Sequence, residues 1–519
     1  MTFIKGQTRF IVLTAILTIF NALITLITPL LLRNIYTNHY QLNYQTLRLV
    51  VGCMIGSFLF QFILLIFREN FAINFNLETS KTLYRKMFEM TYDKLLTLEP
   101  TYLVNRLLEA VIVFYQFVTS SFVTILGNGL VVLISVIIFS TIDSVLGVLM
   151  ILILPINYIG YKVINQKLQQ KSAIMADNNA RSLKEILTVF KNTDYLKQES
   201  DFTTIETIIT PSLLNIYEKM ADINKFARGT SLSIELLNSF FQNLLFLWLA
   251  LAASQNANNL PNLIIASVLF PIYFNAVKSF SSVNLEFRNL KVAHEFINNE
   301  IIGNSEQSGQ QSLQSVEEIK MENIHIEIAQ QSLNLSVNQT FVPGDVVYVN
   351  GPSGAGKSTL MKALIKFRKS KGISFNGIPL ENISNSSLRK RVSYLSQDNT
   401  LLPATVQDNI LFGRLSVDVN WQKFSHSRLL SPLLTTKDLD SILYEGGANL
   451  SGGEKQRIVI ARALVEPADV LILDEVTSNI DKQAADDILA TILEATDTIT
   501  FIISHDKSHR QFCTKEIIL

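Results

Sequence analysis

The stretch Val346-Val-Tyr-Val-Asn350, followed by Gly351-Pro-Ser-Gly-Ala-Gly-Lys-Ser-Thr359, decides how the second half of this chain folds. The apolar run predicts a buried β-strand, and the glycine-rich residues after it predict a phosphate-binding loop. Small residues let successive backbone N–H groups converge on phosphate oxygens, and the helix that follows presents its positive end to them. The residues expected at the phosphates are Gly351, Ser353, Gly354, Ala355, Gly356, Lys357, Ser358 and Thr359.

Two of these residues have more specific expected roles. Lys357 is expected to reach the β- and γ-phosphates, and the Ser358 hydroxyl is expected to bind Mg²⁺. A second apolar run, Val470–Leu473, leads directly into Asp474 and Glu475. It predicts a central strand whose end presents a carboxylate, Asp474, to Mg²⁺. Glu475 then stands where it can polarise an attacking water.

A third motif, Leu450-Ser-Gly-Gly-Glu-Lys-Gln-Arg457, lies between these two segments. Ser451, Gly452 and Gly453 open a helix and predict a second phosphate-binding helix start. The ordered set of three segments resembles the ATPase domain of the ATP-binding cassette (ABC) transporter family. The resemblance implies an α/β P-loop domain with a helical subdomain, and ATP and Mg²⁺ as cofactors. It also implies that the 450–454 signature closes over ATP held by a second ATPase domain, so that the working unit is a dimer.

The resemblance extends to three further residues. Gln397 ends a short strand, Val392–Gln397, and matches the family's Q-loop, whose glutamine contacts Mg²⁺ or the lytic water. Asp481 lies where the family has its D-loop. His505 follows the apolar strand Thr498–Ile503 and matches the switch histidine, which contacts the γ-phosphate and holds the water at Glu475.

The start of this domain departs from the family pattern. Opening strands are expected at Ile319–Ile328 and Thr340–Val342. Relatives usually carry an aromatic residue that stacks on adenine near the end of the first strand. The aligned position here is about Ile328, with His325 nearby, so weaker or less base-selective nucleotide binding is expected.

Composition places a membrane domain before the ATPase domain. The chain has 519 residues with 44 basic and 44 acidic side chains, so no charge excess points to nucleic acid. Only 17% of residues are charged and 48% are hydrophobic, and the deficit of charge lies in the first 300 residues. The cysteines, Cys53 and Cys513, lie in different regions, so neither a disulfide framework nor a cysteine metal site is expected.

Six membrane-spanning helices follow from the uncharged runs, each long enough for a hydrocarbon core of about 30 Å. The runs are Phe10–Leu32, Leu49–Phe67, Ala110–Ile142, Ser144–Tyr161, and Leu236–Val277, which polar residues 254–262 divide into two spans. Lysine and arginine number six in 68–109 and ten in 162–228, whereas 33–48 holds two. This bias predicts a multi-pass protein of the cytoplasmic membrane with a cytoplasmic N-terminus and ATPase domain.

The two basic loops are expected to be helical continuations of the spans, since apolar residues recur in them at three- and four-residue spacing. Long cytoplasmic hairpins resemble the exporter-type ABC membrane domain. In that family the loop tips, here near Leu95–Val104 and Asp194–Thr210, act as coupling helices on the ATPase domains. Merely solvated helices are the alternative.

Polar residues inside the spans have two readings. The amides Asn21, Gln61, Gln116, Asn128, Gln242, Asn243 and Asn275 fit interhelical hydrogen bonds or substrate contacts. Glu235 and Lys278 carry charge, which is costly at mid-bilayer. We hypothesise that they line the inward-facing vestibule. A structural ion pair, or snorkelling to the interface, is the alternative.

The expected domains are a transmembrane domain over 1–302, a polar linker over 303–315 and an ABC nucleotide-binding domain over 316–519. The chain ends soon after His505, so trimmed last strands and dimer contacts are expected. No peptidase domain precedes the first span, so leader-peptide cleavage is not expected of this chain.

Two classes of function remain. One is ATP-driven export of a small peptide or an amphiphilic or hydrophobic compound by a dimer of half-transporters. The partner is either a second copy or a related half-transporter; the latter makes the chain part of an obligate heterodimeric multidrug or lipid exporter. The other class is an ATP-gated membrane regulator that does not pump.

Overall fold

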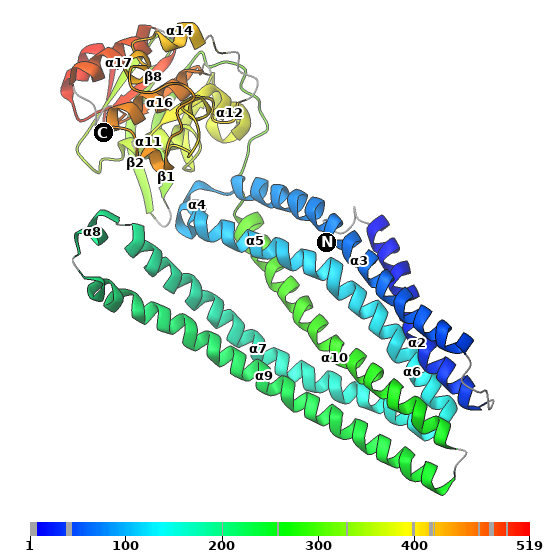
Figure 1. Ribbon diagram of the computed structural model, residues 1–519. Helices are drawn as coiled ribbons and strands as arrows, with labels where there is room; N and C mark the ends of the chain where they lie inside the picture. Colours follow the sequence, from blue (N-terminus) through cyan, green and yellow to red (C-terminus); the bar gives the residue numbers. More distant parts are fainter. Residues whose placement is uncertain are drawn as a thin grey trace. The chain divides into compact units, whose positions relative to one another are not determined.

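The structure is a computed structural model that describes residues 8–37, 44–191, 193–199, 201–256, 259–328, 331–396, 400–414, 419, 421–465, 468–476, 482–494 and 497–519. The chain forms two compact units. The first comprises Met1–Met90 and Leu98–Asn304, and the second comprises Thr91–Thr97 and Ser305–Leu519. The first is helical and the second is an α/β unit, which confirms the expected fold class (Figure 1).

Long helices make up the first unit. They are α2 (Thr8–Thr37), α3 (Tyr44–Phe88), α5 (Pro100–Gln116), α6 (Phe122–Ile142), α7 (Ser144–Lys191), α8 (Thr193–Gln198), α9 (Phe202–Gln255) and α10 (Leu260–Phe296), with π-helical turns η1 (Phe117–Ser121) and η3 (Ile297–Ile301) and the 3₁₀ turn η4 (Ile302–Asn304). The helices α7 and α9 run side by side over most of their length (Figure 1). Both continue far beyond an apolar span, as the helical periodicity of the basic loops predicts.

Within the described residues, six helical segments are long and apolar enough to cross a membrane, which confirms the number of spans expected from the sequence. They are Phe10–Ile27, Arg48–Phe88, Pro100–Ile142, Ser144–Ser172, Phe202–Gln255 and Leu260–Phe280. Many of their large apolar side chains are exposed, as lipid-facing residues are. The unit's core is formed by α6, α7 and α10, where Phe139 stacks on Phe270 at 4.9 Å between ring centroids.

Polar groups in the spans pair with one another in this unit. The Ser57 hydroxyl of α3 donates to Asn21 Oδ1 of α2 at 2.9 Å, which is the interhelical reading of that amide. Lys278 Nζ of α10 lies 2.7 Å from Glu235 Oε1 of α9. The two charges expected in the spans therefore form an ion pair.

The second unit contains two sheets. Its strands are β1 (Ile319–Ile328), β2 (Gln331–Phe341), β3 (Val346–Asn350), β4 (Ser370–Phe375), β5 (Ile378–Pro379), β6 (Val392–Leu395), β7 (Val470–Asp474), β8 (Ile499–Ile503) and β9 (Lys515–Ile518). Strands β2-β1-β4-β5 form an antiparallel sheet, and β6-β7-β8-β3-β9 form a parallel one. The second opening strand is longer than the expected Thr340–Val342, because Leu335 and Val337 turn their side chains into the core and extend the pairing with β1.

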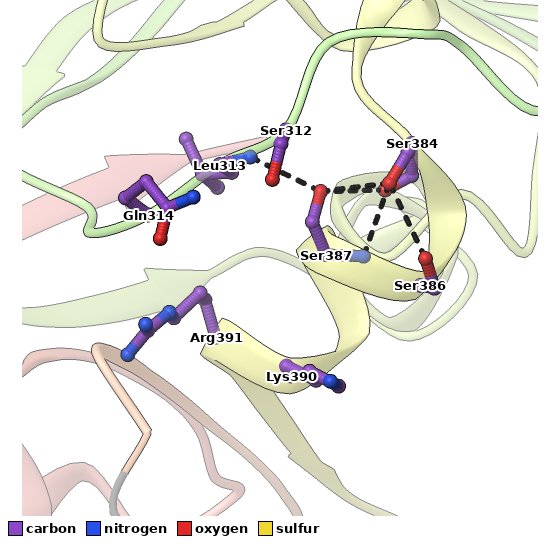
Figure 2. A pocket seen from close by; sticks show the side chains of 8 residues that line it. All are labelled: Ser312, Leu313, Gln314, Ser384, Ser386, Ser387, Lys390 and Arg391. Carbon is purple, nitrogen blue, oxygen red and sulfur yellow. Dashed lines mark hydrogen bonds between the residues drawn. The ribbon is translucent and has the colours of Figure 1, made fainter.

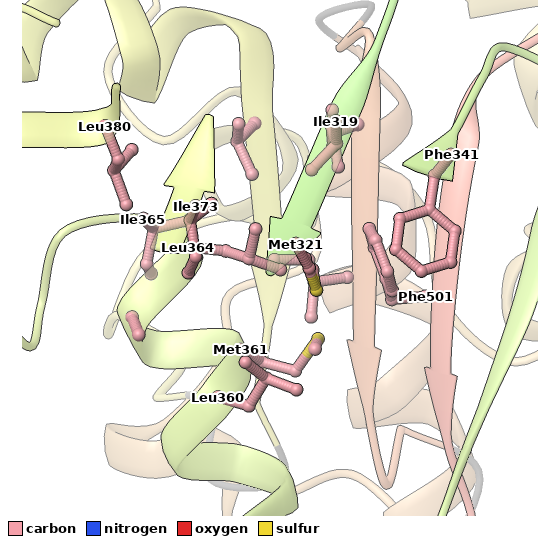
Figure 3. Close-up of a cluster of buried hydrophobic side chains, with 14 of the residues drawn as sticks. Ile319, Met321, Phe341, Leu360, Met361, Leu364, Ile365, Ile373, Leu380 and Phe501 are labelled. Atoms are coloured by element: carbon pink, nitrogen blue, oxygen red, sulfur yellow. The ribbon is translucent and has the colours of Figure 1, made fainter. Parts of the chain in front are cut away.

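The helices of this unit are short. They are α4 (Tyr92–Leu98, whose last residue belongs to the first unit), α11 (Lys357–Leu364), α12 (Asn385–Arg391), α13 (Val406–Leu411), α14 (Trp421–Ser425), α15 (Ser431–Leu434), α16 (Gly452–Val465) and α17 (Lys482–Glu494), with 3₁₀ turns η5 (Leu380–Asn382), η6 (Glu445–Gly447) and η7 (Lys507–Phe512). Leu360, Met361 and Leu364 of α11 point toward the strands and join one core with Met321, Phe341 and Phe501 (Figure 3). This packing fixes the helix that follows the phosphate loop.

The residues expected to form a linker are ordered along η5 and α12. Gln311 N donates to Asn382 O at 2.9 Å, and Ser384 N donates to Gln311 O at 2.8 Å. Leu313 N donates to the Ser387 hydroxyl at 3.1 Å, beside a polar pocket of about 310 Å³ (Figure 2). The residues expected to form a linker therefore make hydrogen bonds to η5 and α12.

The segment Thr91–Thr97 belongs to the second unit, although first-unit helices flank it in the sequence. The Tyr92 ring stacks on Phe367 at 4.7 Å between centroids, and Asp93 forms an ion pair with Arg368. Phe367 and Arg368 lie shortly after α11, which ends at Leu364. The first loop tip expected to couple the domains, Leu95–Val104, overlaps this segment at residues 95–97. Residues 98–104 and the second tip, 194–210, fall in the first unit.

Candidate active site

The expected catalytic residues meet at the carboxyl ends of three neighbouring parallel strands. Because β7, β8 and β3 are adjacent, the turns that follow them share one edge of the sheet. Gly351 follows β3, Glu475 follows β7, and His505 follows β8. Asp474 pairs with Ile503 in the parallel register, and Glu475 N donates to Ile503 O at 3.0 Å. The strand ends coincide with the motifs found in the sequence, and the roles of the motif residues remain predictions.

Two glycines give the phosphate loop its shape. Gly354 and Gly356 have φ values of +83° and +96°, a region that costs side-chain-bearing residues energy. A Cβ atom at Gly356 would lie 2.6 Å from Leu333 Cδ2. The loop therefore passes close to Leu333, whose side chain would have to move for any other residue, and Gly356 caps the start of α11.

Lys357 and Ser358 begin α11 and face the same loop. Lys357 Nζ donates to the carbonyl oxygens of Gly351, at 2.9 Å, and Pro352, at 3.1 Å. The ammonium is thus held over the loop into which the sequence placed phosphates. The Ser358 hydroxyl donates to Asp474 Oδ1 at 3.0 Å, so the two expected Mg²⁺ ligands are adjacent.

Tyr394 completes the surroundings of Asp474, although no sequence pattern predicts a role for it. Its hydroxyl donates to Asp474 Oδ2 at 2.8 Å. Burial and then the charge of Asp474 raise the pKa of Tyr394, so the phenol stays a proton donor. Since Asp474 is 6% exposed, these two donors fix both oxygens of a buried carboxylate. Side chains alternate between the two faces of β6, so more than one of them could have been expected beside Asp474. The sequence alone therefore could not single out Tyr394.

Glu475 and His505 form the second part of the site. His505 Nε2 lies 2.9 Å from Glu475 Oε1, and the side chains are 68% and 21% exposed, respectively. Glu475 has a φ of +56°, a strained backbone conformation for a residue other than glycine. This strain turns the carboxylate away from the course of β7 toward His505. A carboxylate paired with an outward-facing imidazole can accept a proton from water and keep its orientation.

The residues after His505 form the turn η7. Asp506 is the N-cap of η7: its side chain accepts from Ser508 N at 2.8 Å. That bond is the main cause of a lowered pKa for Asp506. Asp506 therefore fixes the start of the turn that follows the histidine.

The signature forms a capping box that starts α16. Glu454 N donates to the Ser451 hydroxyl at 3.3 Å, and Ser451 N donates to Glu454 Oε2 at 2.7 Å. Glu454 also accepts from the Thr436 hydroxyl at 3.0 Å. The pattern Ser-x-x-Glu could have revealed this cap in the sequence. Ser451 and Gly452 remain exposed at the helix start, as a phosphate-binding turn requires.

The capping box predicts acid sensitivity. The Ser451 backbone N–H is the main group that holds the pKa of Glu454 below its ordinary value of 4.5. A lowered folded-state pKa contributes stability that is complete above the unfolded pKa and is lost as pH falls through the folded pKa. We expect Glu454→Gln to cost about 0.5–1 kcal/mol of unfolding free energy at pH 7, and the cost to be lost as pH falls through the folded-state pKa of Glu454.

Trp421 packs in the core beside α16, so its fluorescence can follow thermal unfolding. The chain has two tryptophans, and Trp248→Phe removes the other signal. Glu317→Gln, at an exposed carboxylate, is the matched control. An equal difference in Tm between wild type and Glu454→Gln at pH 7 and at pH 3 would contradict this prediction.

Two candidate residues, Gln397 and Asp481, lie outside the described residues. Their roles remain predictions. At the expected adenine position, Ile328 and Leu333 are partly buried and pack against the core of the two sheets. Among the described residues of this hairpin, aliphatic side chains stand where relatives have an aromatic ring.

These residues suit a nucleotide with a hard cation. Gly354 and Gly356 hold positive φ values, and this backbone shape lets successive N–H groups of the loop turn toward phosphate oxygens. The Ser358 hydroxyl and the Asp474 carboxylate are both oxygen ligands, which Mg²⁺ prefers.

Comparison with known proteins also indicates a nucleotide-binding domain. Residues 296–478 match the family model "ABC transporter". The lactococcin-G-processing and transport ATP-binding protein of Lactococcus lactis subsp. lactis is 28% identical over 387 residues, 71% of this chain and 53% of that protein. The ATP-dependent lipid A-core flippase of Acinetobacter baylyi is 30% identical over 241 residues, 44% of this chain and 42% of that protein. This chain thus matches about half the length of these curated relatives.

Among solved structures, a bacterial Atm1-family ABC exporter with ATP bound has the same fold. The TM-score is 0.84, and the match covers 99% of this chain and 93% of that chain at 17% identity.

Proposed function

We propose that the chain is an ABC transporter, and that two copies of it export a small peptide or an amphiphilic compound, driven by ATP hydrolysis. The observation that carries this proposal is the catalytic edge described above, on a chain that also has six apolar helices. The relatives' names include both a peptide transporter and a lipid flippase, which supports this range of substrates.

The site residues divide the work of hydrolysis. Lys357 and the loop amides bind and orient the phosphates. Bound Mg²⁺, held by Ser358 and Asp474 with Gln397 as a further proposed ligand, would neutralise the developing negative charge. Glu475 accepts the proton of the attacking water, and His505 holds Glu475 in place from 2.9 Å. Ser451, Gly452, Gly453 and Asp481 complete the site of the second copy.

Transport requires a link from this site to the membrane helices. The packing of Tyr92 and Asp93 on Phe367 and Arg368 supports a coupling role for Thr91–Thr97, since these partners lie just beyond the phosphate-loop helix. The Lys/Arg bias of the loops supports a cytoplasmic N-terminus and ATPase domain.

The proposal predicts ATPase activity from the purified chain alone in lipid, because every described motif residue of a competent site is present. Activity together with a dimeric mass would support a homodimer. A folded, ATP-binding chain without activity would instead favour an obligate heterodimer with a related half-transporter. Hydrolysis that opens a passive conductance would favour the ATP-gated regulator.

We also propose weak selectivity for the nucleotide base, because Ile328 and Leu333 offer aliphatic surface instead of an aromatic ring. The Kd values for ATP and GTP are expected to agree within about threefold. An aromatic stack adds about 0.5–1.5 kcal/mol, so Ile328→Tyr is expected to tighten ATP binding by about two- to tenfold. Titration with fluorescent nucleotide analogues measures both, with Ile328→Leu as the control. An unchanged ATP affinity in the tyrosine variant would place the base elsewhere.

A further inference from the structure

A buried histidine close to His505 has no role in the mechanism above. His509 lies in η7 and is 2% exposed. Its Nδ1 is 2.8 Å from the Ser504 hydroxyl, and Ser504 directly precedes His505. The same hydroxyl accepts from Asp506 N at 3.0 Å, and Ser504 O accepts from the Tyr348 hydroxyl at 3.0 Å. His509 is therefore one of three groups that fix the turn bearing His505.

The other ring nitrogen of His509 faces α17. Its Nε2 lies 3.7 Å from Asp486 Oδ1, which is too long for a hydrogen bond. Neither atom has a hydrogen-bond partner among the described residues. Since a carboxylate can only accept, the complementary tautomer carries its proton on Nε2, and Nδ1 then accepts from the Ser504 hydroxyl. An approach of about 1 Å between α17 and η7 would make the missing bond.

We propose that His509 is a positioning residue: it holds the turn of His505 through Ser504, and an approach of α17 would bond it to Asp486 and tie the turn to that helix. The proposal rests on the ATP hydrolysis proposed above. The helix α17 begins at Lys482, directly after Asp481. A shift of α17 is then communicated to His505 through Asp486, His509 and Ser504.

Two substitutions separate these contacts. His509→Asn keeps an acceptor near the position of Nδ1 but is too short to reach Asp486. His509→Gln carries its amide toward Asp486 but loses the group at Nδ1. Each is expected to lower kcat for ATP about tenfold, the effect of one lost hydrogen bond, with KM unchanged within about threefold. Asp486→Ala is expected to match His509→Asn, and the double variant to be no worse than either. His426→Asn is the control, because that histidine bonds Gln422 O at an exposed turn.

If His509 acts through His505, substitution of His509 should have little effect once His505 is removed. A purely structural role of His509 does not predict this result. In a His505→Ala background, His509→Asn is expected to change the single-turnover rate by less than about twofold. A kcat within twofold of wild type in both His509 variants would overturn the proposal, and so would an undiminished tenfold loss in the His505→Ala background.

Hydrogen exchange separates this proposal from the proposed function. Amide exchange in the peptide that covers Ser504–Asp506 is expected to be about tenfold faster in His509→Gln than in wild type, with or without activity. Unchanged exchange would overturn the proposal even in an active transporter. If the wild-type chain binds but never hydrolyses ATP, the function fails, and the exchange result still decides whether His509 holds the turn.

Discussion

Glu475→Gln is expected to lower the ATPase rate of the purified chain by about 10²–10⁴-fold, the usual contribution of a general base. Glutamine preserves the shape of the side chain and can still hydrogen-bond His505 Nε2, which lies 2.9 Å from the carboxylate. It cannot accept the proton of the attacking water. ATP binding is therefore expected to stay within about threefold of wild type, and the variant should accumulate as an ATP-bound dimer.

Phosphate release in lipid nanodiscs measures the rate, and size exclusion with and without Mg-ATP measures the dimer. Glu381→Gln, at an exposed glutamate in η5, is the matched control and should hydrolyse ATP normally. Retention of more than a tenth of the wild-type rate in Glu475→Gln would show that another group accepts the proton.

Lys357→Ala is expected to weaken ATP binding itself. The ammonium is held over the phosphate loop by Gly351 O and Pro352 O, at 2.9 and 3.1 Å. Loss of one charge-assisted hydrogen bond to a phosphate costs about 1.5–3 kcal/mol, so Kd is expected to rise about 10- to 100-fold. The rate of hydrolysis falls as well, because the same charge stabilises the transferring phosphoryl group.

Titration of the chain with a fluorescent ATP analogue measures this Kd. Lys371→Ala removes an exposed ammonium from β4 and serves as the control. Lys357 lies at the end of the phosphate loop, whereas Lys371 lies in β4. Equal affinity in both would remove Lys357 from the phosphate site.

Much of the catalytic edge could be predicted from the sequence. Strand, glycine-rich loop and helix follow one another directly at Val346–Thr359, so local chemistry determines the local structure. The apolar run into Asp474 likewise fixes where a buried strand ends. Register then brings Asp474 beside Ile503 and Glu475 beside His505.

Residues that act through tertiary contacts could not be found in this way. Tyr394 reaches Asp474 from a strand 80 positions earlier, and His509 meets Asp486 across two elements. Neither lies in a motif, and neither has a distinctive spacing. The segment 303–315 is expected to be a linker because its residues are polar and small. Composition could not show that residues of this segment hydrogen-bond with η5 and α12.

The same limit applies to the membrane helices. Uncharged runs indicate six spans, but the sequence could not pair Asn21 of α2 with the Ser57 hydroxyl of α3. The π-helical turn Phe117–Ser121 interrupts the third span without a proline or glycine to mark it.

We propose that this chain alone couples ATP hydrolysis to uphill export. The most direct measurement uses proteoliposomes that contain only this chain, with outward-facing ATPase domains, Mg-ATP outside and a panel of labelled small peptides and amphiphiles. We expect ATP-dependent accumulation of a panel member inside the vesicles against its gradient. Vesicles that contain Glu475→Gln should show no such accumulation. The opposite result is ATP hydrolysis by the wild-type chain with downhill flux only, and the same flux through ATP-bound Glu475→Gln. It would contradict uphill export and favour an ATP-gated membrane regulator.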